Sequence, residues 1–163
     1  MSTFWQTIAI VLLFTIVGGI FAAAETALIS LRDSQVKKLA TTGRRGRRLE
    51  KLMLNPNRFL GSVQVGVTLA GFLSAGYGAS KIVPVFSPQI VSWGLSQSAA
   101  ETLAFVGATV LIAYMSLVVG ELTPKRLAIQ HAERYALLLA TPVDFIAKIT
   151  APFIWLLSKS SDA

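Results

Sequence analysis

Three stretches of this sequence are long and apolar enough to cross a lipid bilayer, and they constrain the fold more than any other feature. They cover residues 4–31, about 59–80 and about 102–122. A helix needs about 20 largely apolar residues to cross the hydrocarbon core of a membrane. Only 14% of the residues are charged, whereas soluble domains carry about 25%. The sequence therefore predicts an all-α membrane protein with three transmembrane helices.

Basic residues are concentrated between the first and second apolar stretches. Residues 32–58 contain nine basic residues against two acidic ones, a net charge of +7 that equals that of the whole chain. The next connection carries only Lys81 and Glu101. Because loops rich in Lys and Arg stay in the cytoplasm, we expect the N-terminus outside the cell and residues 32–58 inside. The block contains no aromatic residue that could stack on bases, so we expect no nucleic-acid partner.

Two other segments leave their arrangement open. Residues 137–157 are apolar but interrupted by two prolines and two charged residues, a pattern typical of a helix on the membrane surface, with a fourth crossing as the alternative. We expect a cytoplasmic-side juxtamembrane, or belt, helix over about residues 126–157, a tail at 159–163 and the C-terminus inside. Residues 82–98, which contain Pro84 and Pro88, form either an external loop or a re-entrant segment.

The inventory of reactive side chains excludes several kinds of site. The chain has no cysteine, which excludes disulfides, thiolate metal sites and cysteine nucleophiles. His131 is the only histidine, which excludes a multi-histidine zinc or iron site. No glycine-rich phosphate loop and no Ser-His-Asp set is present. We therefore expect no enzymatic activity.

Two carboxylates lie at similar depth in the apolar stretches. Glu25 is followed by Arg32, and Glu121 by Lys125, at about 10 and 6 Å along a helix. An ionisable side chain inside a membrane span usually faces the bundle interior or a water-filled cavity. Two such residues make a cation site the leading hypothesis.

The segment 120–125 has the features of a cation ligand set. Pro124 has no N–H to offer, and its ring clashes with the carbonyl four residues earlier, which belongs to Gly120. A carboxylate beside such a carbonyl is an oxygen-rich arrangement that a hard cation prefers. The alternative is that Pro124 only ends the helix at the membrane interface. Glu25 is either a second ligand or, as we expect, a structural partner of Lys125 or Arg126.

Four motifs occur along the chain in a fixed order. They are FAAAETALIS at 21–30, NPNRFL at 55–60, QVGVTLAGFL at 64–73 and GELTPK at 120–125. Together they resemble the transmembrane domain of the CNNM/CorC family of hemolysin-like magnesium transporters. The resemblance implies a multi-pass protein of the cell membrane that forms a homodimer. It also implies downstream CBS and CorC-type domains, so we expect residues 1–158 to be the membrane domain of a longer protein.

The resemblance further implies a magnesium site among the three helices, on the cytoplasmic side. The residues that correspond best to its ligands are Thr26, Thr68, Gly120 and Glu121. Many relatives have serine where this chain has Ala22 or Ala24, and asparagine where it has Val67 and Gly71. Because Mg²⁺ gives up water reluctantly, a site with fewer protein oxygens retains more water or binds more weakly.

These observations predict the membrane domain of a divalent-cation transporter that exports Mg²⁺, with Glu121 as the principal anionic ligand. The alternative is a non-transporting membrane scaffold or ion-sensing domain that relays the state of cytoplasmic CBS domains. The missing asparagine and serine ligands favour that alternative. A membrane-lytic toxin has little support, because the chain shows no amphipathic pore-forming pattern.

Overall fold

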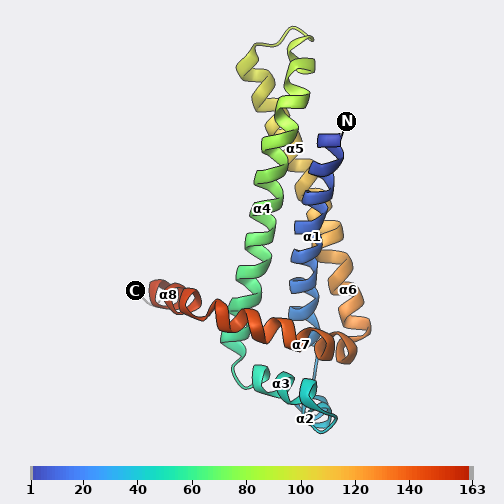
Figure 1. Cartoon of the computed structure of the whole chain (residues 1–163), viewed down its shortest axis with the longest axis vertical. Helices are drawn as coiled ribbons and strands as arrows, with labels where there is room; N and C mark the ends of the chain where they lie inside the picture. Colours follow the sequence, from blue (N-terminus) through green and yellow to red (C-terminus); the bar gives the residue numbers. More distant parts are fainter. Residues whose placement is uncertain (1, 162–163) are drawn as a thin grey trace.

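Long helices running side by side form the body of the molecule (Figure 1). The structure, a computed structural model, describes residues 2–161 and contains only helices and turns in that range. The long helices are α1 (Ser2–Ile29), α4 (Pro56–Val91) and α5 (Gln97–Leu117). After α5 the chain continues through a π-helical turn, η1 (Val118–Leu122), into α6 (Thr123–Gln130). The shorter helices are α2 (Asp33–Ala40), α3 (Arg44–Met53), α7 (Ala132–Ile149) and α8 (Ala151–Ser161).

The three predicted apolar helices are confirmed as candidate membrane spans. Within the described residues, Phe4–Ile29, Phe59–Val91 and Gln97–Gln130 are each long and apolar enough to cross a membrane. The second and third are longer than the sequence predicts. The 36 residues of α4 extend over about 54 Å at 1.5 Å per residue, which exceeds the hydrocarbon core of about 30 Å. Part of α4 therefore extends beyond any span it makes.

Residues 82–98, predicted as an external loop or a re-entrant segment, are mostly helical, and only residues 92–96 form a turn between two helices. Helix α4 continues through Pro84 and Pro88, and α5 begins at Gln97 with Ser96 as its N-cap. Both prolines are exposed, and each leaves the carbonyl four residues earlier without its helical N–H donor. Gly94, with a φ of +93°, supplies the left-handed residue of the turn. The resulting α4–α5 turn, here called the hairpin end, extends past the N-terminal end of α1 (Figure 1).

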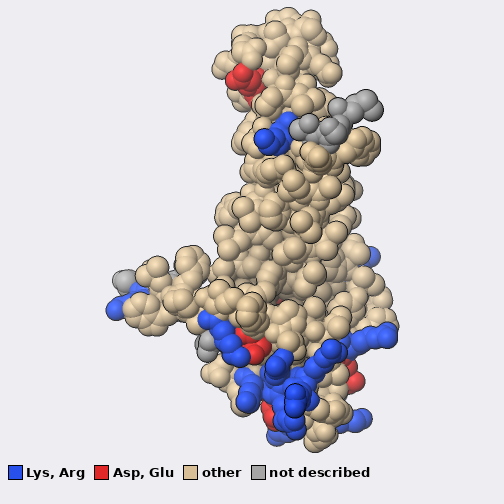
Figure 2. Space-filling model, in the orientation of Figure 1, with Lys and Arg blue, Asp and Glu red and all other residues tan. Residues whose placement is uncertain are grey.

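At the opposite end, α2 and α3 form a packed helical hairpin within residues 32–58, where α4 begins at Pro56. Helices α2 and α3 bury Val36, Leu39, Leu49 and Leu52. Gly46 lies so close to α2 that a Cβ at this position would overlap the Leu39 carbonyl. The Lys and Arg side chains of this region gather on the surface at what we call the basic end (Figure 2). Two amphipathic helices, α2 and α3, therefore lie in a segment whose sequence is dominated by positive charge.

Helix α7 crosses the long helices at the basic end and closes the main hydrophobic core (Figure 1). Its buried residues Ala136, Leu139, Ala140 and Val143 belong to one cluster with residues of α1, α2, α3 and α4. Two hydrogen bonds attach α7 to helices α2 and α3. The Arg48 Nη1 donates to the Thr141 hydroxyl at 3.1 Å, and the Gln35 Nε2 donates to the Glu133 carboxylate at 3.0 Å.

The predicted juxtamembrane segment, residues 126–157, is divided into separate helices. Its first residues belong to α6, which continues the third candidate span, and breaks at His131 and Thr150 separate α6, α7 and α8. Pro142 lies inside α7. The predicted tail is helical as far as Ser161, and residues 162–163 lie outside the described range. Neither α7 nor α8 is among the candidate spans found in the described chain.

Candidate cation site between the long helices

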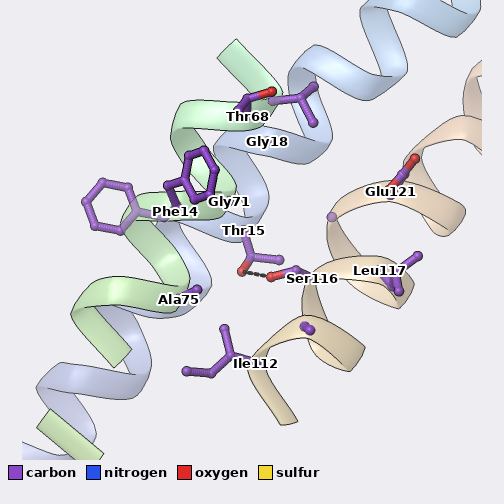
Figure 3. A pocket seen from close by; sticks show the side chains of 14 residues that line it. Phe14, Thr15, Gly18, Thr68, Gly71, Ala75, Ile112, Ser116, Leu117 and Glu121 are labelled. Atoms are coloured by element: carbon purple, nitrogen blue, oxygen red, sulfur yellow. Dashed lines mark hydrogen bonds between the residues drawn. The ribbon is translucent and has the colours of Figure 1, made fainter. Parts of the chain in front are cut away.

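A cavity of about 420 Å³ lies between α1, α4 and the helix formed by α5 and η1 (Figure 3). Its walls are mostly apolar and include the rings of Phe14 and Phe72. Glu121 is the one acidic residue among its described lining residues. Thr68 and Glu121 come from different helices (Figure 3), and by their places along α4 and η1 both lie nearer to the basic end than Ala75 and Ile112 do. The arrangement places one carboxylate beside a partly open, largely apolar space.

Small residues create this space. Gly18 brings α1 close to α4, because a Cβ there would lie 3.4 Å from the Ala70 Cβ. Gly71 has no neighbouring atom within 4 Å of where its Cβ would be. Glycine and alanine let membrane helices approach one another, and here they also leave room where a larger side chain would fill the cavity.

Glu121 lies on η1, where the helix is widened by one residue. The Thr123 N–H donates to the Val118 carbonyl, five residues earlier. Pro124, at the start of α6, has no N–H for the Gly120 carbonyl, which accounts for the local change of pattern. The Gly120 oxygen lies 3.3 Å from where a Gly19 Cβ would be, so this carbonyl faces α1. π-Turns of this kind are frequent at functional sites.

Three hydroxyls connect the helices on the hairpin side of the cavity. Thr15 Oγ1 lies 3.2 Å from Ser74 Oγ and 3.4 Å from Ser116 Oγ, and Ser74 donates to the Val11 carbonyl at 3.3 Å. Each hydroxyl has a single proton, so Thr15 donates to Ser74 and Ser116 donates to Thr15. This order leaves the Ser116 oxygen as an acceptor at the cavity wall.

The Glu121 carboxylate is paired with an ammonium of its own chain. Lys125 Nζ donates to Glu121 Oε1 at 2.7 Å, and the two side chains are 35% and 42% exposed, respectively. Residues four apart are neighbours on a helix surface, and η1 leads directly into α6. The predicted pair between Glu25 and Lys125 or Arg126 is therefore wrong. Within residues 2–161, Glu25 makes no ion pair.

Three of the four predicted ligands line the cavity: Thr68, Gly120 and Glu121. The fourth, Thr26, does not, because it lies about 12 Å beyond Gly18 along α1, toward the basic end. Val67 and Gly71, where relatives are expected to have asparagine, also line the cavity but carry no side-chain oxygen. Sequence reasoning missed Thr15, although its polar side chain lies in an apolar stretch one turn before Gly18.

Metal binding itself stays a prediction. In the part of the chain that the structure describes, no three His, Cys, Asp or Glu side chains form a cluster that could hold a metal ion. A cation in this cavity would meet one carboxylate and several neutral oxygens.

The sequence matches the family described as cyclin M transmembrane N-terminal domain, CNNM, over residues 8–163. The chain belongs to the CNNM family. This CNNM domain is 36% identical over 154 residues to UPF0053 protein sll0260 of Synechocystis sp., covering 94% of the chain and 34% of that relative. It is 33% identical over 142 residues to UPF0053 protein YhdP of Bacillus subtilis, covering 86% of the chain and 32% of the relative.

A third relative has a name that states a function. The polyamine export protein of Haemophilus influenzae is 29% identical over 160 residues, which cover 95% of this CNNM domain and 36% of the relative. The chain spans about a third of the length of all three relatives. Family membership and the three candidate spans together identify a membrane protein of a family that includes a transporter.

Proposed function

We propose that this CNNM domain is the membrane domain of a cation transporter that binds its cargo beside Glu121. The observation that carries the proposal is the position of this carboxylate in a cavity between three candidate spans. A charged side chain inside a membrane costs roughly 2.5–3.5 kcal/mol on insertion scales, and such residues mark ion pathways. The Lys125 ammonium offsets part of that cost, and a bound cation would do so in its place.

The charge distribution supports a basic end that faces the cytoplasm, with the hairpin end outside (Figure 2). Helices α7 and α8 then lie at the cytoplasmic interface of the cell membrane, with the C-terminus inside. A row of exposed apolar side chains along α7 and α8 supports this placement. These side chains can contact lipid, while the opposite face of α7 is buried in the core. The row consists of Leu138, Phe145, Ile149, Phe153 and Leu156.

Mg²⁺ is the cargo that family membership favours. The cavity of about 420 Å³ is large compared with the roughly 30 Å³ that one water occupies, so a partly hydrated ion fits. Mg²⁺ usually keeps several waters and is held by one or two carboxylates. Glu121 would supply the charge, while the hydroxyl oxygens of Thr68 and Ser116 would contact the ion or its waters.

An organic polyamine is the second candidate cargo. The name of the Haemophilus influenzae relative motivates it, and two features of the cavity favour it. The rings of Phe14 and Phe72 line the same space as Glu121, and aromatic faces attract ammonium groups. The Lys125 ammonium already forms an ion pair with the Glu121 carboxylate. An ammonium group of a polyamine would form the same kind of ion pair.

Transport is tested by reconstituting the purified chain in liposomes and following the efflux of Mg²⁺ and, separately, of spermidine. We expect Mg²⁺ to leave the vesicles faster than from protein-free liposomes, with slower or no movement of spermidine. The reverse order would assign the polyamine as cargo. Binding of Mg²⁺ without movement of either cation would favour the non-transporting, ion-sensing alternative.

Lys125 is expected to compete with the cargo for Glu121. Lys125→Met removes the ammonium but keeps a long side chain. The Glu121 carboxylate then no longer has to release Lys125 before it binds Mg²⁺. Exposed pairs four residues apart contribute about 0.3–0.5 kcal/mol, and this pair is partly shielded, so we expect the Kd for Mg²⁺ to fall about twofold or more. Titration by thermal unfolding of the detergent-solubilised chain measures this.

The matched control is Lys148→Met, which removes a similar pair with Asp144 at 2.8 Å on α7, outside the cavity. We expect the Kd of this variant to equal that of the wild type. An unchanged or weakened affinity in Lys125→Met would show that the lysine does not compete with the cation.

A further inference from the structure

A second cavity, of about 520 Å³, lies at the basic end and has no part in the proposed cation site. Helix α3, helix α7 and the break before α7 form its walls. The lining residues are Arg45, His131, Arg134, Tyr135, Leu137 and Leu138. The cavity thus combines cationic and hydrogen-bonding side chains with two leucines.

Two guanidinium groups from different helices line this cavity. Arg45 comes from the first turn of α3 and Arg134 from the first turn of α7. Neither has a hydrogen-bond or ion-pair partner in the described part of the chain. Arginine binds phosphate through two parallel N–H groups. Two such forks without an acidic partner favour an anion with several oxygens.

The helix starts add to the positive potential. Helix α3 has 10 residues and α7 has 18, and neither start has a side-chain cap. Uncapped N–H groups and the helix dipole favour an anion at such a position. The nearby Glu133 carboxylate accepts a hydrogen bond from Gln35 and does not line the cavity. No carboxylate therefore neutralises the described lining of this site.

The apolar part of the cavity identifies the source of the anion. Leu138 is 57% exposed and begins the apolar row along α7 and α8. An acyl chain placed along this row would lie beside the two arginines, whereas a free phosphate ion would gain nothing from the leucines. We propose that the cavity binds the phosphate group of an anionic phospholipid. Basic pockets near the cytoplasmic ends of membrane helices bind lipid head groups in this way.

The proposal is tested by following the thermal unfolding of the detergent-solubilised chain during lipid titration. We expect dioleoyl phosphatidylglycerol to stabilise the chain saturably. Dioleoyl phosphatidylcholine and inorganic phosphate at the same concentrations should have little effect. Equal stabilisation by phosphatidylcholine would show an apolar contact only, and equal stabilisation by inorganic phosphate would show a site for the free ion. Either result overturns the proposal.

Variants locate the lipid. The double change Arg45→Gln and Arg134→Gln is expected to weaken phosphatidylglycerol binding at least tenfold. The control Arg47→Gln and Arg126→Gln removes the same charge outside the cavity and should stay within twofold of the wild type. Equal losses in both would show attraction to net charge rather than a site.

A third variant covers the case in which the double change does not fold. Arg134→Lys keeps the charge but loses the planar fork, so we expect several-fold weaker binding with unchanged lipid-free stability. Wild-type affinity in this variant would contradict a direct contact between Arg134 and the phosphate. None of these results depends on which cation the domain transports.

Discussion

Glu121→Gln is expected to abolish the stabilisation of the chain by Mg²⁺. The substitution keeps the size and hydrogen-bonding capacity of the side chain and removes the one negative charge among the described residues that line the cavity. The remaining ligands are neutral oxygens, which cannot replace the hydration shell of a divalent ion. At a Mg²⁺ concentration 100 times the Kd, binding stabilises a folded protein by about 2.7 kcal/mol, and we expect this increment to disappear.

The measurement is thermal unfolding with and without Mg²⁺, using two controls. Glu101→Gln removes the same charge from an exposed position on α5, and Thr109→Ala changes a hydroxyl residue that lines a different cavity between α4 and α5. Both should retain the full Mg²⁺ effect. If Glu121→Gln is stabilised as much as Glu101→Gln, the ion binds elsewhere.

Gly46→Ala is expected to destabilise the chain by about 3 kcal/mol or more. Overpacked substitutions usually cost 1–3 kcal/mol, and more where the neighbour is unable to move. Here the added Cβ would overlap the backbone carbonyl of Leu39, which no side-chain rotation relieves. Helices α2 and α3 would have to separate, and α7 would lose part of the surface that it packs against.

The matched control is Gly76→Ala in α4, where no atom lies within 4 Å of the new Cβ. Alanine is favoured over glycine in a helix by about 0.8–1.0 kcal/mol, so this variant should unfold at or above the wild-type temperature. Circular dichroism of both variants in detergent measures the difference. Equal unfolding temperatures would contradict the close contact between α2 and α3.

The sequence was sufficient to predict the three candidate spans, because length and hydropathy alone determine them. It was insufficient for the ends of the helices. Pro84 and Pro88 indicate a break, yet α4 passes through both on an exposed surface. In residues 32–58 the high charge obscured a helical spacing that is present, since Val36 and Leu39, and likewise Leu49 and Leu52, are three residues apart and buried.

The candidate site was partly predictable for a related reason. Motifs identify Glu121 and Gly120, but the position of a residue along a helix does not tell which neighbour it faces. Thr26 and Thr15 are both threonines of α1, and only Thr15 lies at the level of the cavity. In the same way, the sequence places Lys125 at a similar membrane depth to both Glu25 and Glu121. It pairs with Glu121, which lies four residues earlier on the same continuous helix.

The widened turn at Val118–Leu122 also determines how this segment tolerates changes in length. Each residue of a helix advances the chain by about 1.5 Å and rotates it by about 100°. A π turn holds one residue more than an α-helical turn. Removing a single residue from it would let the turn close to an ordinary α-helical one, so that α6 keeps its place, with Pro124 against Gly19 and Ala128 fully buried. A one-residue deletion within Val118–Leu122 is therefore expected to alter the surroundings of the Glu121 carboxylate while the fold of α6 persists.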